Sequence, residues 1–172
     1  MQSHNLDVIE RALNGRSGVS VMSDATAIGI LTAVAESVLK WMSDKSYTYE
    51  DQTYNLSDSV GCAIYKKGVL IRMFIPARQA SGPSRITYHK LTYYESGRQS
   101  LEAALNNRSV AMLGDYTLGV YAAMPYGLWV DQSLGDGGDN KRGKGWFSGP
   151  GGLKDFAFSE FNRIKDEFIR NK

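Results

Sequence analysis

The stretch TYNLSDSVGCAIYKKGVLIRMFIP, residues 53–76, decides the fold. It is typical of a β-hairpin with a polar entry, a tight turn at Lys66, Lys67 and Gly68, and an apolar second arm. Apolar side chains recur at every second position, which is the period of half-buried strands. They are Val60, Cys62 and Ile64 in the first arm and Val69, Ile71, Met73 and Ile75 in the second. No side chain in the stretch has the character of a catalytic group, so it indicates architecture rather than chemistry.

Two amphipathic helices are predicted on either side of this hairpin in the sequence. The first is capped by Ser23 or Asp24 and repeats apolar residues at spacings of three and four as far as Met42. Such a helix must pack along a sheet or along another subunit, and we expect the apolar second arm of the hairpin to be its platform. The second closes the chain over residues 153–172, with Phe156, Phe161, Ile164 and Phe168 on one face.

Shorter elements complete the prediction. We expect a short helix at 6–13 within an arm or docking helix at 1–22, a third strand of the same sheet at 86–94, a helix at 96–107, and strands at 110–113 and 115–123. The predicted class is α+β, with a mixed or antiparallel sheet of about four to five strands packed against the long helix in the N-terminal half. The glycine-rich residues 135–152 are expected to form a flexible loop.

Composition excludes several classes of protein. With 172 residues and 42% hydrophobic content, the chain suits one domain over residues 1–172 with a core of its own. A net charge of +2, from 20 basic and 18 acidic residues, gives no global field for nucleic acid or membrane surfaces. The single Cys62 excludes an internal disulfide and fits a reducing compartment. No stretch near the N-terminus resembles a signal peptide, and polar residues interrupt 25–42, so we expect neither secretion nor a membrane span.

Catalytic and metal-binding patterns are missing from the sequence. His4 and His89 are the two histidines, and His89 has no second histidine or carboxylate at ligand spacing. Asp131, Asp136 and Asp139 cluster in the sequence, where they either bind a hard cation or, as we expect, keep the glycine-rich loop solvated. The glycine-rich loop lacks both phosphate-binding signatures, and no serine lies in a nucleophile elbow. We therefore expect no enzyme, no catalytic residue, no cofactor and no metal site; a small enzyme using His89 is the weakest alternative.

Two motifs resemble those of the neck and tail-completion proteins of tailed bacteriophages, which sit at the head-to-tail junction. The first is similar to that family's T-G-N-L-x-x-S-I segment and falls on Thr53, Asn55, Leu56 and Ser59, with Tyr54 where the family has glycine. The second is similar to a strand followed by a Pro-Tyr-Ala-like tripeptide and an acidic end. It falls on Val120, Pro125, Tyr126, Val130 and Asp131, with Gly127 in place of the usual alanine. Relative to that pattern, residues 77–107 are an insertion.

The resemblance implies a virion structural protein, made in the cytoplasm of the bacterial host, that acts by ring self-assembly and by docking to connector or portal proteins and to tail proteins. The interface candidates are Tyr54, Lys66, Lys67, Arg78, Arg85, Tyr126, Trp129, Lys141, Arg142 and Lys144. Loops with Arg78, Arg85 and the basic residues of 141–144 either face a DNA channel or an acidic partner, or are simply solvated. Contact with DNA would be non-specific, and no membrane partner is expected.

A second hypothesis is a membrane-active or ligand-binding β-rich module. The segment YTLGVYAAMPYGLWV, residues 116–130, concentrates tyrosine and tryptophan as interfacial sites do. It faintly resembles a strand of the sea-anemone cytolysins. The predicted C-terminal helix counts against that family, whose members end in strands.

Overall fold

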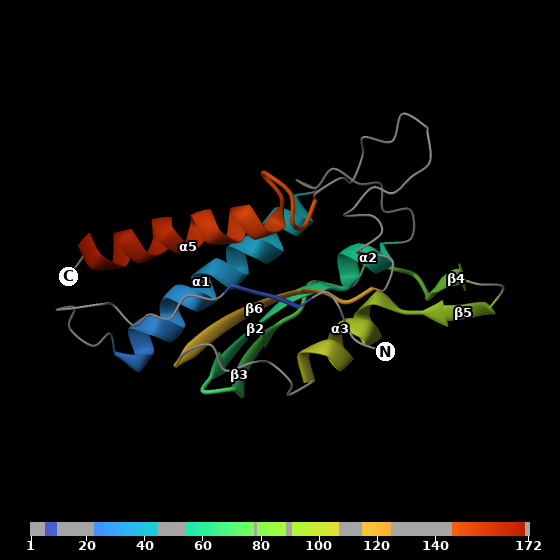
Figure 1. Cartoon of the computed structure of the whole chain (residues 1–172), viewed down its shortest axis with the longest axis horizontal. Coiled ribbons are helices and arrows are strands. Elements are labelled where there is room, and N and C mark those ends of the chain that lie inside the picture. The colour runs from blue at the N-terminus through green and yellow to red at the C-terminus, as the bar shows by residue number, and fades with distance from the viewer. Residues whose placement is uncertain are drawn as a thin grey trace.

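A computed structural model of the chain describes residues 6–9, 23–44, 54–77, 79–88, 91–106, 115–124 and 146–170 (Figure 1). The elements are β1 (Leu6–Ile9), α1 (Asp24–Ser43), α2 (Asn55–Asp58), β2 (Val60–Lys66), β3 (Val69–Phe74), β4 (Ser84–Tyr88), β5 (Leu91–Glu95), α3 (Gly97–Asn106), β6 (Tyr116–Ala122) and α5 (Leu153–Arg170). The predicted α+β class with an antiparallel sheet is confirmed.

The main sheet is built from β6, β2 and β3, all antiparallel, and β1 pairs along the outer edge of β6, which gives the order β1-β6-β2-β3. The predicted hairpin of β2 and β3 is confirmed. Its turn consists of Lys67 and Gly68, with φ angles of 49° and 76°. Two positive φ angles in a two-residue connection match the right-handed twist of the strands, and glycine reaches the second without steric cost.

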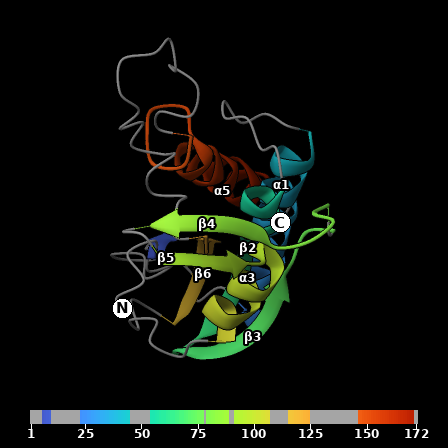
Figure 2. The same ribbon diagram turned by 90° about the vertical axis from the view of Figure 1, so that its right-hand side faces the viewer.

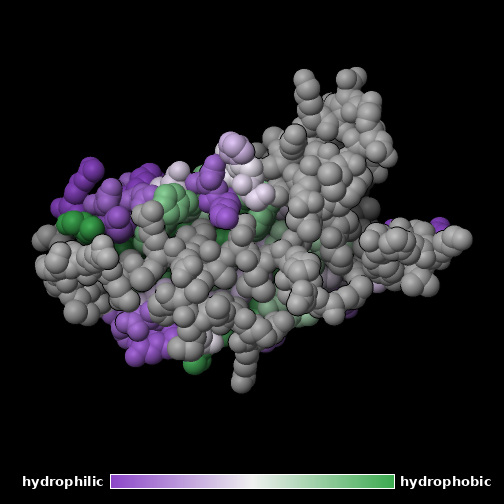
Figure 3. Space-filling model, in the orientation of Figure 1, coloured by the Kyte–Doolittle hydropathy of each residue, from purple (hydrophilic) through white to green (hydrophobic). Residues whose placement is uncertain are grey.

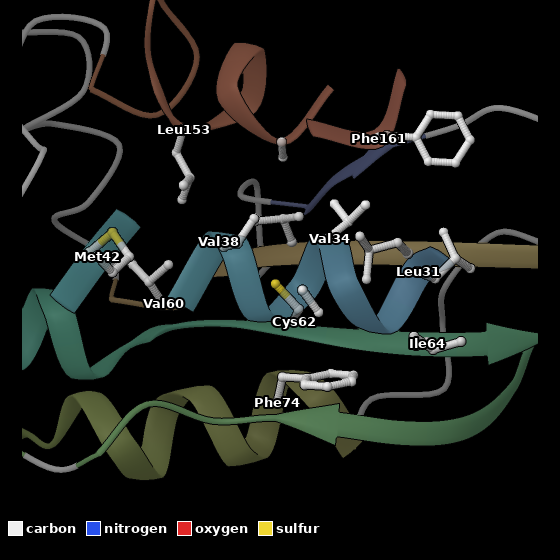
Figure 4. Close-up of a cluster of buried hydrophobic side chains, with 14 of the residues drawn as sticks. Leu31, Val34, Val38, Met42, Val60, Cys62, Ile64, Phe74, Leu153 and Phe161 are labelled. Atoms are coloured by element: carbon white, nitrogen blue, oxygen red, sulfur yellow. The ribbon is translucent and has the colours of Figure 1, made fainter. Parts of the chain in front are cut away.

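α1 lies between the main sheet and α5 (Figures 1 and 4). Ser23 caps it, because its side chain accepts a hydrogen bond from the backbone N–H of Thr26. The buried side chains of α1 meet the sheet on one side and Leu153 and Phe161 of α5 on the other. A fully buried Val, Leu, Ile, Phe or Met side chain contributes about 1.5–3 kcal/mol, so the packing of α1 against the sheet and α5 is the main source of stability.

The platform for α1 differs from the prediction. Val60, Cys62 and Ile64 of the first arm face the helix, together with Leu118 and Val120 of β6. From the second arm Phe74 joins this core, whereas Val69, Ile71 and Met73 are exposed. β2 and β6 are central strands that are covered on both faces, whereas β3 is an edge strand, and much of it remains exposed.

The opposite face of the main sheet carries a second, smaller core. Leu101 and Leu105 of α3 pack there on Ala63, Tyr65 and Tyr121. α3 lies within the stretch 77–107, so the part of the chain that resembles an insertion closes one face of the sheet.

The N-terminal prediction is wrong where the structure describes it. Leu6–Ile9 form β1, whose Cα atoms pair with β6 from Leu6 opposite Tyr121 to Ile9 opposite Leu118, and not a helix. Short apolar runs are ambiguous between helix and strand, and an available sheet edge decides the outcome here. The remaining residues of 1–22, where the sequence predicts a docking segment, lie outside the described part of the chain.

The predicted third strand at 86–94 is also wrong. The structure has two strands there, β4 and β5, which pair with each other as a separate two-stranded sheet, with Tyr88 opposite Leu91. In this pairing Leu91 and Tyr93 occupy positions on the same face as Ile86 and Tyr88, whereas one continuous strand would place them on the opposite face. The predicted membership of the four- to five-stranded sheet, which included residues 86–94, is therefore not confirmed.

The other predicted helices and the strand at 115–123 are confirmed as α1, α3, α5 and β6. The predicted flexible loop at 135–152 can be compared with the structure only from residue 146 onward, and there the prediction is wrong. Trp146 and Phe147 are buried in the core, and their carbonyl oxygens accept hydrogen bonds from the N–H groups of Leu153 and Lys154. Residues 135–145, 110–113 and 125–131 lie outside the described part of the chain.

α1 is long and apolar enough to cross a membrane, a test that the core helix of a soluble domain also passes. Within this fold, seven of its side chains are buried against the sheet and α5, and these include Ile30, Val34, Ala35 and Val38. Its apolar character is accounted for by this two-sided packing.

Candidate functional site: a buried turn, a projecting hairpin and an open sheet edge

The one-turn helix α2 is a polar element inside the fold. Asn55, Ser57 and Asp58 are buried together with Leu56, which joins the main core. Tyr54, which precedes α2, adopts a left-handed conformation with φ 58° and ψ 6°. This left-handed residue makes a sharp backbone turn directly before α2.

The Asp58 carboxylate binds the segment that follows β3. It accepts hydrogen bonds from the backbone N–H of Gln79 (2.9 and 3.1 Å, to its two oxygens) and from that of Ala80 (2.9 Å). Hydrogen bonds to an ionised acceptor are roughly twice as strong as neutral ones. Asp58 therefore anchors the chain just before β4.

The Asn55 amide binds on both sides of the next hairpin. Its Nδ2 donates to the carbonyl oxygen of Gly82 at 2.8 Å, and its Oδ1 accepts from the backbone N–H of Gly97 at 2.8 Å. A Cβ atom at Gly97 would lie 1.8 Å from the carbonyl oxygen of Asn55, so only glycine fits this approach of α3 to α2.

The β4–β5 hairpin projects beyond the end of the main sheet, past α2 and α3 (Figures 1 and 2). Among the described strands, β4 and β5 pair only with each other. Arg85 and Tyr94 occupy opposite positions on the two strands and are both exposed, Tyr94 by 66%. We call this element the arm.

The outer edge of β3 is the second open surface. Val69, Ile71 and Met73 are exposed by 64%, 45% and 39%, and no described strand pairs with this edge. Ile71 is the extra residue of a β-bulge, because Ile64 pairs with Arg72 and Tyr65 with Leu70. The Arg72 guanidinium lies 4.9 Å from the centre of the Phe74 ring. We call these residues the β3 edge.

Lys66 and Lys67 lie at the tip of the β2–β3 hairpin, where they differ in environment. Lys66 forms an ion pair with Asp24 at the start of α1, which raises the pKa of Lys66 and lowers that of Asp24. Lys67 is exposed, and its backbone N–H donates to the carbonyl oxygen of Asp115 at 2.9 Å. The ion pair between Lys66 and Asp24 connects the end of β2 to the start of α1, so part of the positive charge at this tip is compensated within the subunit.

Few groups in the described part of the chain have the chemistry of a reactive site. Cys62 is fully buried, and burial raises the pKa of its thiol, which keeps it protonated. The described residues contain no group of three or more histidine, cysteine or carboxylate side chains that could hold a metal ion. The surface of α5 carries ion pairs of ordinary helical type, in which Arg163 bridges Glu160 and Glu167; Figure 3 shows this face as hydrophilic.

Four of the ten interface candidates lie in the described residues, and the structure does not bring them together. Tyr54 begins α2, Lys66 and Lys67 share the hairpin tip, and Arg85 lies on the arm. The other six lie outside the described residues: Arg78, Tyr126, Trp129, Lys141, Arg142 and Lys144.

Sequence reasoning missed the residues that shape the open surfaces. The sequence places Asn55 in a motif and gives no indication of the role of Asp58. The available signal is that a polar run, residues 57–59, lies directly before the apolar start of a strand. The exposed β3 residues had the same alternation as a half-buried strand, so their pattern alone could not reveal an edge.

Comparison with protein-family models, with curated proteins and with solved structures finds no match to this chain. The function is therefore argued from the arrangement of its own residues.

Proposed function

We propose that this protein is a virion structural protein of a tailed bacteriophage that acts at the head–tail junction, in the neck or tail-completion position. It self-assembles into a ring and docks onto connector or portal proteins and tail proteins. It is made in the bacterial cytoplasm, has no enzymatic activity and uses no cofactor.

The observation that carries this proposal is the presence of two different open surfaces on one subunit, the arm and the β3 edge. A closed cyclic assembly needs two unlike, complementary surfaces on each subunit, so that each copy presents one to the copy before it and the other to the copy after it. The arm and the β3 edge lie on different parts of the molecule (Figures 1 and 2). In the proposed ring, the arm of one copy packs against the β3 edge of the next.

The arm supports this role because an isolated two-stranded hairpin is marginally stable in water. Its register places Ile86, Tyr88, Leu91 and Tyr93 at positions of one face. The β3 edge offers Val69 and Ile71 as the apolar counterpart, and an exposed apolar edge strand is a known template for association.

Tyr54 adds support to the resemblance with the neck and tail-completion proteins. The motif of that family has glycine at this position, and the left-handed backbone of Tyr54 is the conformation that glycine favours. The adjoining Asn55, Leu56 and Ser59 are buried, as expected of motif residues that build the fold.

Basic residues are a secondary part of the proposal. Lys67 and Arg85 are exposed and could face DNA in a central channel without sequence preference. Lys66 is the weaker candidate of the hairpin tip, because its charge is paired with Asp24.

The test is the size of the assembled particle, measured by light scattering after gel filtration and by negative-stain microscopy. Ile71→Lys places a charge in the β3 edge and should abolish the ring while the fold is retained. Ile169→Lys is the matched control, since Ile169 is exposed by 56% near the end of α5 and lies outside both surfaces. This variant should assemble normally.

A chain that stays monomeric with portal and tail components, and whose coding region lies far from those of capsid and tail proteins, would contradict the proposal. Binding to liposomes would instead favour the membrane-active alternative. The packing of the apolar helix α1 on two sides counts against that alternative.

A further inference from the structure

The Asn55 side chain contacts the chain on both sides of the arm, and we call these two segments, before β4 and after β5, its stems. Gly82, whose carbonyl oxygen accepts from Asn55 Nδ2, lies two residues before β4, and Gly97, whose N–H donates to Asn55 Oδ1, lies two residues after β5. Only this orientation of the amide satisfies both partners, since a carbonyl needs a donor and an N–H needs an acceptor. A single planar group therefore fixes the separation of the two stems.

A second side chain, three residues further along the same short helix, fixes the first stem again. Asp58 receives the N–H groups of Gln79 and Ala80. The entry to the arm is thus held at 79, 80 and 82, and its exit at 97. Both stems are attached to α2, whose four residues are all buried and which leads through Ser59 into β2.

We propose that Asn55 and Asp58 form a clamp that sets the direction of the arm relative to the main sheet, and that opening the clamp lets the arm swing as a unit about its stems. The arm has no strand partner among the described strands outside itself, so its direction depends on its stems. In the ring, this direction decides whether the arm meets the next subunit, and that consequence alone rests on the proposed function.

The burial of the clamp gives it strength. Asn55 and Asp58 are exposed by 1% and 2%, so water cannot readily replace a lost partner. Two substitutions of Asn55 should weaken the clamp to different degrees. Asn55→Asp keeps an acceptor for Gly97 but loses the donor to Gly82, whereas Asn55→Ala loses both.

The experiment measures the distance between two spin labels on the monomeric chain by pulsed electron paramagnetic resonance. Tyr94→Cys places one label on the arm and Glu36→Cys the other on the exposed side of α1. The native Cys62 is fully buried and should not react with the label. The parent protein should give one narrow distance distribution.

We expect Asn55→Ala to broaden this distribution about twofold or more and Asn55→Asp to broaden it less, because partial release of a stem permits local opening. Asp58→Asn serves as a second variant if Asn55→Ala does not fold. Tyr65→Phe is the matched control: it removes the buried hydrogen bonds of the Tyr65 hydroxyl to Tyr121 and Leu105, neither of which is a stem residue, and should leave the distribution narrow.

A distribution that stays narrow in the folded Asn55 and Asp58 variants would overturn the clamp and reduce both residues to ordinary core contacts. The measurement is made on monomers, so its outcome is independent of ring formation. A clamp that opens as expected in a chain that never assembles would refute the proposed function and leave the clamp standing.

Discussion

The hydroxyl oxygens of Tyr65 and Tyr121 lie 2.7 Å apart, buried beneath the main sheet. Tyr65 also donates to the carbonyl oxygen of Leu105, at 3.3 Å. Since a hydroxyl has one proton, Tyr121 must donate to Tyr65, and Tyr65 to Leu105. This relay connects β6, β2 and the end of α3.

The relay predicts unequal effects of removing its two hydroxyls. Tyr65→Phe leaves Tyr121 without an acceptor and Leu105 without this donor, and should cost about 1–3 kcal/mol in the free energy of unfolding. Tyr121→Phe leaves the bond from Tyr65 to Leu105 intact and should cost about 1 kcal/mol or less. Urea unfolding of both single variants and the double variant measures the difference. Equal losses would contradict the direction of the relay.

The same pair predicts a loss of stability at alkaline pH. Burial raises the pKa of both Tyr65 and Tyr121 above the value of 10.0 for a free tyrosine. The folded state therefore favours the protonated hydroxyls, and their contribution is complete below about pH 10 and is lost as the pH rises above it. Urea unfolding at pH values from about 8 to about 11, on either side of the pKa of a free tyrosine, should show this decline. In the double Phe variant the decline should be shallower; an identical slope would exclude the tyrosines as its cause.

The approach of α3 to α2 predicts that Gly97 is irreplaceable. Gly97→Ala would place a methyl group against the Asn55 carbonyl oxygen and should destabilise the fold by at least about 2 kcal/mol. Gly82→Ala is the matched control, since a Cβ atom there meets nothing within 4 Å. Thermal unfolding of the two variants tests the contrast, and similar melting temperatures would show that α3 can move away without cost.

The left-handed backbone at Tyr54 predicts an order of stability between two truncations. Tyr54→Ala and Tyr54→Gly both remove the aromatic ring, and they differ only in the Cβ atom. The glycine variant should be the more stable of the two by about 1 kcal/mol, because alanine retains the steric strain of a positive φ angle. Chemical denaturation resolves a difference of this size. A more stable alanine variant would mean that the turn adjusts when the ring is lost.

Charge reversal at the hairpin tip separates the roles of Lys66 and Lys67. Lys66→Glu places a carboxylate beside Asp24 and should weaken the closure of α1, which the double change Lys66→Glu with Asp24→Lys should restore. Lys67→Glu alters an exposed charge and should leave stability unchanged. If the tip contacts a neighbouring subunit, the Lys67 variant should assemble less well than the parent protein in gel filtration. Unchanged assembly in both variants would argue against a contact at this tip.

Much of the fold could be predicted because its elements follow local rules. The period of α1 and its cap at Ser23, the turn at Lys67 and Gly68, and the alternation of β2 all have local causes. What failed is non-local. Whether Leu6–Ile9 form a helix or a strand depends on the free edge of β6, and whether 86–94 extend the main sheet depends on which strand each part of them pairs with.

The candidate surfaces were harder to predict for the same reason. Val69 and Ile71 are residue types that are usual in a buried strand, and only the position of β3 at the edge of the sheet makes them exposed. Asn55 and Asp58 have partners 21 to 42 residues away in the chain, so no local pattern connects them to the arm.

The packing of α1 between the sheet and α5 has a consequence for the timing of synthesis. α5 follows every other described element in the chain, so the side of α1 that faces Leu153 and Phe161 stays uncovered until α5 has left the ribosome. A nascent chain with β2, β3 and β6 already paired would still expose an apolar stripe along the length of α1. Chains interrupted before residue 153 should therefore be the ones that aggregate or recruit chaperones, whatever the state of their sheet.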